Sequence, residues 1–312
     1  MWLFRSVDRQ QLWAQLLRTD WRWLALAVLL APAGLLVRAQ RWRYLFPPGS
    51  NPPGLVPSVM IGYMVNNVLP LRAGEIVRVY VVSRRWRREG GFWTVAATLI
   101  VERVLDSLCI VLILVGLVFL IEVPRVIKWA AAIMLAVDVT GISVLVAIAT
   151  IPVRFRRLIE RLTARWPGIQ ARLLRAFETF LHGLDGIRAR GHVVPIILWT
   201  VVVWMLPAAA AWTGLRAANL ALPWLAGWVV LAFVGLGVSI PSAPGYVGVF
   251  HAAALLAVRV FGVGEAEGLG FAIIFHASQF IPITLVGWFY LVREHMTIGE
   301  AARASAKTTP LV

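Results

Sequence analysis

The sequence is poor in cysteine and in charged residues, and each shortage excludes a class of protein. Its single cysteine, Cys109, excludes an intrachain disulfide framework and a zinc site built on cysteines. Charged residues are only 14% of the 312 residues, whereas 60% are hydrophobic, so a soluble protein of this composition would have an implausibly apolar surface. The composition predicts a membrane protein.

Hydrophobic segments recur along the chain at lengths near the roughly 20 residues that a membrane-spanning helix needs. Eight such segments cover about residues 21–37, 55–71, 92–121, 126–151, 193–215, 223–240, 243–261 and 268–292. The mean hydropathy of the chain is +0.80. We therefore expect an all-α fold, a polytopic transmembrane helical bundle.

Three regions make up the expected domain organisation. Residues 1–20 are predicted to be a cytoplasmic amphipathic N-terminus, residues 21–292 a single transmembrane domain, and residues 293–312 a short cytoplasmic tail. Within the domain, residues 154–190 carry apolar side chains at helical spacing between arginines. This pattern predicts amphipathic helices on the membrane surface, interrupted at Pro167 and Gly168.

Basic residues set the expected orientation. Of the 30, only Lys128 and Lys307 are lysines, and the arginines gather beside apolar segments, which favours anionic membrane lipids as partners and excludes nucleic acid. If the arginine-rich stretches lie on the cytoplasmic side of the cell membrane, both termini are cytoplasmic, together with residues 72–91 and 152–192. Three arginines at positions 38, 41 and 43 then fall outside, so a re-entrant segment near residues 55–71 is the alternative.

Two apolar segments end in the same Pro-x-x-x-Gly spacing. Pro70 and Gly74 end one, and Pro241 and Gly245 end the other, with Pro244 beside the second glycine. A broken backbone in hydrocarbon is expected only where it faces protein or a water-filled cavity. The repetition indicates two related halves with a substrate site between them, as in many secondary transporters, and leaves open whether the halves are parallel or inverted.

Charged residues also lie within the segment at 92–121. Glu102 and Asp106 are four residues apart and share a helix face, so a cation or a shared proton is expected between them. Arg103 is one residue off that face, which makes Arg72 or Arg78 from the broken segment a candidate partner. An ion-pair cluster that joins two helices and a headgroup or proton site are both consistent with this pattern, and the two can coexist.

Single polar residues mark three other segments. Asp138 lies near the middle of the segment at 126–151, where it serves either proton coupling, as Glu102 and Asp106 also could, or a structural hydrogen bond. His251 and His276 lack the spacing of metal ligands, so we expect no metal site and no cofactor. These histidines are expected to bond to backbone freed at the breaks or to a phosphate.

Taken together, the motifs resemble the transmembrane-region family of lysylphosphatidylglycerol synthases. The resemblance is carried by Asn66-Asn67-Val-Leu-Pro70-x-Arg72-Ala-Gly74-Glu75-x-x-Arg78, Glu102-Arg103-x-x-Asp106, Pro241-Ser242-Ala-Pro244-Gly245-Tyr-x-Gly248-x-Phe250-His251, and His276. In the multiple-resistance synthases, this domain translocates aminoacylated phosphatidylglycerol between leaflets. Stand-alone relatives are flippase-like, and others are coupled to polyprenyl-phosphate glycosyl chemistry.

This resemblance implies a lipid flippase rather than an enzyme. Because only a short tail follows Arg293, we do not expect the chain to make lysyl-lipid. The expected substrate is an anionic or phosphate-bearing lipid: a phospholipid, an aminoacyl-phospholipid or a polyprenyl-phosphate-linked lipid. The resemblance assigns its headgroup to a polar cavity formed by Asn66, Asn67, Arg72, Glu75, Arg78, Glu102, Arg103, Asp106, Ser242, Gly245, His251 and His276.

Two other functions stay open at this point. The chain could be a non-catalytic membrane partner of a lipid- or glycan-modifying enzyme, docked through residues 154–190. It could also be a membrane-embedded transferase acting on a polyprenyl phosphate, with Glu75, Glu102 or Asp106 as a base or metal ligand, although no Asp-x-x-Asp motif is present. No Walker A motif occurs, and no pattern defines an oligomeric state.

Overall fold

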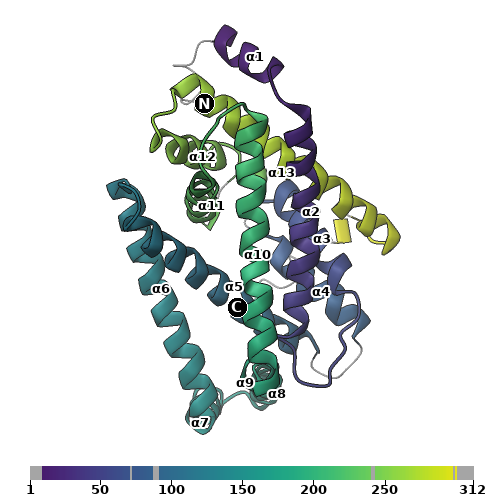
Figure 1. Cartoon of the computed structure of the whole chain (residues 1–312). Coiled ribbons are helices and arrows are strands. Elements are labelled where there is room, and N and C mark those ends of the chain that lie inside the picture. Colours follow the sequence, from purple (N-terminus) through teal and green to yellow (C-terminus); the bar gives the residue numbers. More distant parts are fainter. Residues whose placement is uncertain (1–8, 71, 87–90, 240–242, 298, 301–312) are drawn as a thin grey trace.

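The computed structural model describes residues 9–70, 72–86, 91–239, 243–297 and 299–300 (Figure 1). All regular structure in these residues is helical, as expected. The elements are α1 (Arg9–Leu17), α2 (Trp21–Arg43), α3 (Leu55–Val68), α4 (Gly74–Arg85), α5 (Gly91–Val118), α6 (Arg125–Thr150), α7 (Pro152–Leu162), α8 (Pro167–Gly183), α9 (Asp185–Arg188), α10 (Arg190–Ala217), α11 (Trp224–Ser239), the 3₁₀ turn η2 (Pro244–Tyr246), α12 (Val249–Arg259) and α13 (Glu265–Arg293).

Helix lengths separate elements that can cross a membrane from those that cannot. Among the described helices, α2, α6, α10 and α13 are long and apolar enough to span a bilayer. Helix α5 has 28 residues but carries three charged side chains near its middle. Helices α3 and α11 have only 14 and 16 residues, about 21 and 24 Å against a hydrocarbon core of about 30 Å. The expectation of about eight spanning segments is therefore not met.

Two half-length hairpins replace the missing crossings. Helix α3 packs against α4, and α11 packs against α12. Their tips meet inside the bundle, where a Cβ built on Gly245 would lie 3.3 Å from the carbonyl oxygen of Asn67. Because each hairpin enters and leaves by the same end, the arrangement favours the re-entrant alternative for residues 55–71.

The chain contains an inverted repeat. In each half a long helix, a half-length hairpin and a second long helix follow one another: α2 to α5 and α10 to α13. Helices α2 and α10 lie side by side in opposite directions (Figure 1). At one end the backbone N–H of Asp20 donates to the Ala217 carbonyl (2.9 Å), and at the other a His192 ring nitrogen lies 2.8 Å from the Tyr44 carbonyl oxygen. The structure thus selects the inverted arrangement that the sequence left open.

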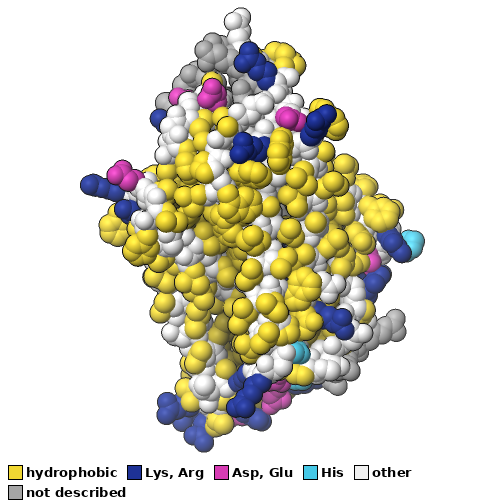
Figure 2. Space-filling view, viewed as in Figure 1, with side chains coloured by type: hydrophobic (Ala, Val, Ile, Leu, Met, Phe, Trp, Pro, Cys, Tyr) yellow, Lys and Arg dark blue, Asp and Glu magenta, His cyan; other side chains and the backbone are white. Residues whose placement is uncertain are grey.

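The two ends of the bundle differ in charge. Figure 2 shows a broad hydrophobic band with basic side chains gathered at the end that holds α7, α8 and α9, which we call the arginine end. The C-terminus of α13 also lies on that side, since Arg85 at the end of α4 pairs with Glu294 (2.6 Å). Helix α1 lies at the opposite end, where Asn219 donates to the Arg18 carbonyl.

Five long helices (α2, α5, α6, α10 and α13) run between the arginine end and the opposite end, and this odd number places α1 and the end of α13 at opposite ends of the bundle. This arrangement does not support the prediction of two cytoplasmic termini. Within residues 72–91, which were predicted to be cytoplasmic, helix α4 packs inside the bundle, with Val77 and Arg78 buried.

The opposite placement of α1 and α8 can be tested by cysteine labelling. Ala14 and Ala171 are both exposed, so each can be replaced by cysteine in a Cys109→Ala background. We expect a membrane-impermeant maleimide to label Ala14→Cys and Ala171→Cys from opposite faces of sealed vesicles. Labelling of both from the same face would contradict the five-crossing arrangement.

Helices α7 and α8 form an antiparallel pair at the arginine end, with Pro167 as the first residue of α8. Gln170 of α8 donates to the Glu160 carbonyl of α7 (3.0 Å), and Arg156 contacts the carboxylate of Glu178 (3.3 Å). The pair is attached to the bundle through α5, where Thr94 donates to the Thr179 carbonyl (3.3 Å). Exposed leucines leave α7 with an apolar outer face.

Candidate functional site

The tip of the first hairpin is held by amides and by a close backbone approach. Asn66 Oδ1 accepts a hydrogen bond from the Gly74 N–H (2.8 Å), which joins the end of α3 to the start of α4. A Cβ on Gly74 would overlap the carbonyl oxygen of Gly62, so only glycine allows this approach. Asn67 donates to Thr284 of α13 (2.9 Å). Both asparagines thus position the tip.

Below the tip lies a group of four charged side chains that we call the buried layer: Arg41, Arg78, Glu102 and Asp106. Their side chains are at most 9% exposed. Arg78 donates to both carboxylate oxygens of Glu102 (2.9 and 2.8 Å), a bidentate pair. Arg41 contacts Asp106 (2.7 Å), while its Nε and Nη1 have no hydrogen-bond acceptor among the described residues. The expected partner from the broken segment is therefore Arg78.

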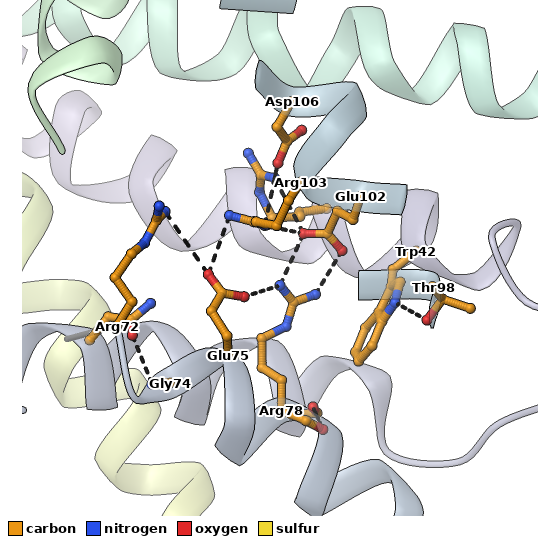
Figure 3. A network of polar contacts seen from close by, with 12 residues as sticks. Trp42, Arg72, Gly74, Glu75, Arg78, Thr98, Glu102, Arg103 and Asp106 are labelled. Atoms are coloured by element: carbon orange, nitrogen blue, oxygen red, sulfur yellow. Dashed lines mark hydrogen bonds and ion pairs between the residues drawn. The ribbon is translucent and has the colours of Figure 1, made fainter. Parts of the chain in front are cut away.

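Aromatic packing supports the Arg78 guanidinium. It lies over the ring of Trp42 at 4.3 Å from the centroid, and Trp42 donates its indole N–H to Thr98 (3.0 Å; Figure 3). Ser58 donates to the Arg78 carbonyl (2.9 Å), which joins α3 to α4 at this level. The position of Arg78 is thus set by α2, α3, α4 and α5 together.

The accessible layer of the cluster consists of Arg38, Arg72, Arg103 and Glu75. Their side chains are 12%, 30%, 29% and 24% exposed. Figure 3 shows Arg72, Arg78 and Arg103 converging on Glu75; Arg103 is 3.4 Å from its carboxylate and Arg72 is 4.0 Å away. Arg38 hydrogen-bonds to Asp106. The accessible layer therefore lies directly against the buried layer.

Histidines hold the tip of the second hairpin. The rings of His251 and His276 are 4.8 Å apart. His276 Nε2 is 2.8 Å from the Gly245 carbonyl oxygen, and the Gly248 N–H donates to His251 Nδ1 (3.4 Å). The expected bonds to backbone at the break are thus confirmed. Gly245 has φ +65°, a conformation that favours glycine.

A cavity of about 210 Å³ lies between the two tips. Its walls are mainly aromatic and aliphatic, and its lining includes Tyr63, Asn67, Gly245, Tyr246, Phe250, Phe275, His276 and Phe280. Tyr63 lies 5.8 Å from the Arg38 guanidinium, and the Tyr246 hydroxyl interacts with Arg72. Through these tyrosines the cavity adjoins the accessible layer.

A comparison with protein families matches residues 1–287 to the model described as the lysylphosphatidylglycerol synthase transmembrane region. This chain belongs to that family. The resemblance inferred from the motifs is confirmed, and the chain is an integral membrane protein of a family with a lipid-related role. Comparisons with curated proteins and with solved structures found no match.

Some residues that the sequence singled out lie apart from the cluster or outside the described residues. Pro241 and Ser242 are outside the described residues. Asp138, the buried acid of α6, faces α5, where it interacts with Ser107, and it belongs to none of the described ion pairs. Its role in proton coupling stays a prediction.

Two arginines of α2 complete the site in this family member and were missed as site residues. Arg38 and Arg41 supply the cations for Asp106, 68 and 65 positions away in sequence. The sequence contained a signal for them, because the predicted topology placed these arginines on the outer side of the membrane, where arginines are not expected. An arginine that contradicts the predicted orientation can be the partner of a buried acid instead of a marker of the cytoplasmic side.

Proposed function

We propose that this protein is a lipid flippase that moves an anionic, phosphate-bearing lipid between the leaflets of the cell membrane. The observation that carries the proposal is the charge of the cluster. Five arginines surround three carboxylates at the meeting point of two half-length hairpins. A surplus of positive charge within an apolar bundle is costly unless an anion shares the site.

The geometry suits a phosphate headgroup with an apolar tail. Guanidinium groups stay charged when buried and offer planar, bidentate donors to phosphate oxygens. Arg72 and Arg103 each have an Nε without a hydrogen-bond acceptor among the described residues, and both belong to the accessible layer. The headgroup would bind there while the hydrocarbon remains in lipid or in the aromatic cavity.

Alternating access would use the inverted hairpins. The α3–α4 hairpin enters from the arginine end and the α11–α12 hairpin from the opposite end, so movement of one against the other would expose the site to each leaflet in turn. The excess of arginines at the end that holds α7 and α8 favours a cytoplasmic location for that end. In this orientation α1 faces the outside.

We also propose that the chain performs no chemistry on the lipid. Every carboxylate of the cluster lies within 4.0 Å of at least one arginine, which leaves none uncommitted as a base or metal ligand. A membrane-embedded transferase would require one of them to be released. The partner alternative instead predicts that the cluster arginines are dispensable and that α7 and α8 are essential.

Lipid translocation in proteoliposomes tests the proposal. Arg72→Ala and Arg103→Ala should slow translocation of a fluorescent anionic lipid by at least about tenfold, since a hydrogen bond to a charged group contributes about 1.5–3 kcal/mol. Arg43→Ala is the matched control, because Arg43 is exposed on α2 two positions beyond Arg41. Wild-type rates in both cluster variants would refute the flippase proposal.

A further inference from the structure

The charge surplus of the cluster has a definite size. Five guanidinium groups (Arg38, Arg41, Arg72, Arg78 and Arg103) face three carboxylates (Glu75, Glu102 and Asp106), which leaves two positive charges. The buried layer is neutral by itself, because it contains two arginines and two acids. The whole surplus therefore belongs to the accessible layer, the part that a ligand can reach.

None of the described ion pairs joins a further acid to these five arginines. Glu294 pairs with Arg85, Glu160 and Glu178 pair with Arg156 on the surface, and Asp185 contacts Arg188. Asp138 lies on α6 against Ser107. Tyr63 and Tyr246 also lie beside the accessible layer. The compensating charge must come from the ligand.

We propose that the preferred substrate carries a terminal phosphomonoester, a headgroup with about two negative charges, rather than a phosphodiester with one. This inference rests on the proposed flippase function and names its substrate class. A phosphomonoester carries roughly 1.5 to 2 negative charges at pH 7 and three acceptor oxygens. It neutralises the accessible layer, whereas a phosphodiester leaves one positive charge without a partner in an apolar environment.

The adjoining cavity sets the geometry of the tail. At about 210 Å³ it has roughly the volume of seven water molecules, so it admits a short stretch of one hydrocarbon chain. Tyr63 and Tyr246 stand between this cavity and the arginines. A lipid with a terminal phosphate can place the phosphate against the arginines while part of its hydrocarbon enters the cavity. Phosphatidate and a polyprenyl phosphate share this chemistry.

Binding to the full-length protein in phosphatidylcholine nanodiscs tests the inference. Phosphatidate and phosphatidylglycerol with identical acyl chains differ in the esterification of the phosphate, and we expect phosphatidate to bind at least tenfold more tightly. A polyprenyl phosphate in a parallel titration identifies the source of the phosphomonoester. Equal binding of the two phospholipids, or tighter binding of phosphatidylglycerol, would overturn the inference and leave the flippase proposal intact.

Charge variants provide the matched controls. Arg72→Gln lowers the surplus to one charge and should reduce the preference for phosphatidate to less than about threefold, whereas Glu75→Gln should keep or increase it. Both side chains are partly exposed, and unchanged melting temperatures would establish that both variants fold. Binding of inorganic phosphate without binding of any lipid would assign the site to free phosphate and overturn the inference. Failure of every anion to bind would refute the inference and the proposed function together.

Discussion

Replacing Glu102 with glutamine is expected to destabilise the protein by about 3–5 kcal/mol, the usual cost of removing one partner from a buried ion pair. The Glu102 side chain is fully buried and accepts two hydrogen bonds from Arg78, which is itself 1% exposed. Glutamine has nearly the same shape, so the loss comes from charge. The guanidinium of Arg78 cannot move to water because it lies against Trp42.

An exposed ion pair provides the control for this variant. Glu160 pairs with Arg156 at 3.1 Å on α7, where both side chains face solvent. Glu160→Gln should change the free energy of unfolding by less than about 1 kcal/mol. The comparison is made by chemical unfolding in detergent micelles. Similar losses in the two variants would show that the Glu102 pair is not buried as described.

Replacing Gly74 with alanine should separate the first hairpin. A Cβ at this position would overlap the Gly62 carbonyl oxygen, and its next contact is the Asn66 side chain that bonds to the Gly74 N–H. The overlapping carbonyl belongs to the backbone of α3, so it cannot move aside as the end of a flexible side chain could. Overpacking of this kind costs about 1–3 kcal/mol, and here it also displaces the start of α4, which carries Glu75 and Arg78.

Gly116 is the matched control for Gly74. It lies in α5, and a Cβ there would meet no atom within 4 Å. Gly116→Ala should leave the free energy of unfolding unchanged or raise it by up to about 1 kcal/mol, since alanine is the better helix former. Melting temperature and lipid translocation are measured for both variants. A Gly74→Ala protein as stable and active as Gly116→Ala would contradict the close approach of α3 and α4.

Several features of the site could be predicted because their signals lie within one segment. Pro70 and Gly74 interrupt an apolar run, and the structure ends α3 and starts α4 around them. Glu102 and Asp106 share a helix face and require cations, and arginines do surround them. The bond between His276 and the backbone at the second break could also be predicted, since a backbone group freed in an apolar region needs a hydrogen-bond partner.

Other features depended on how distant segments pack. Asp106 takes its cations from α2, and no periodicity within α2 or α5 indicates which arginine faces which acid. The placement of α1 and the end of α13 at opposite ends of the bundle could not be predicted for a related reason. A hairpin that turns back and a helix that crosses can have similar hydropathy, so counting apolar segments could not separate them.

The membrane class, the helical fold, the positions of the two breaks and most of the charged residues of the cluster could be predicted from the amino-acid sequence. These follow from local chemistry: apolar length, proline and glycine geometry, and the cost of an unpaired charge in hydrocarbon. The folded structure was needed to establish the inverted arrangement, the opposite placement of α1 and the end of α13, and the contribution of Arg38 and Arg41. Those depend on the packing of α2 against α10 and on the meeting of the two tips, contacts between residues far apart in the chain.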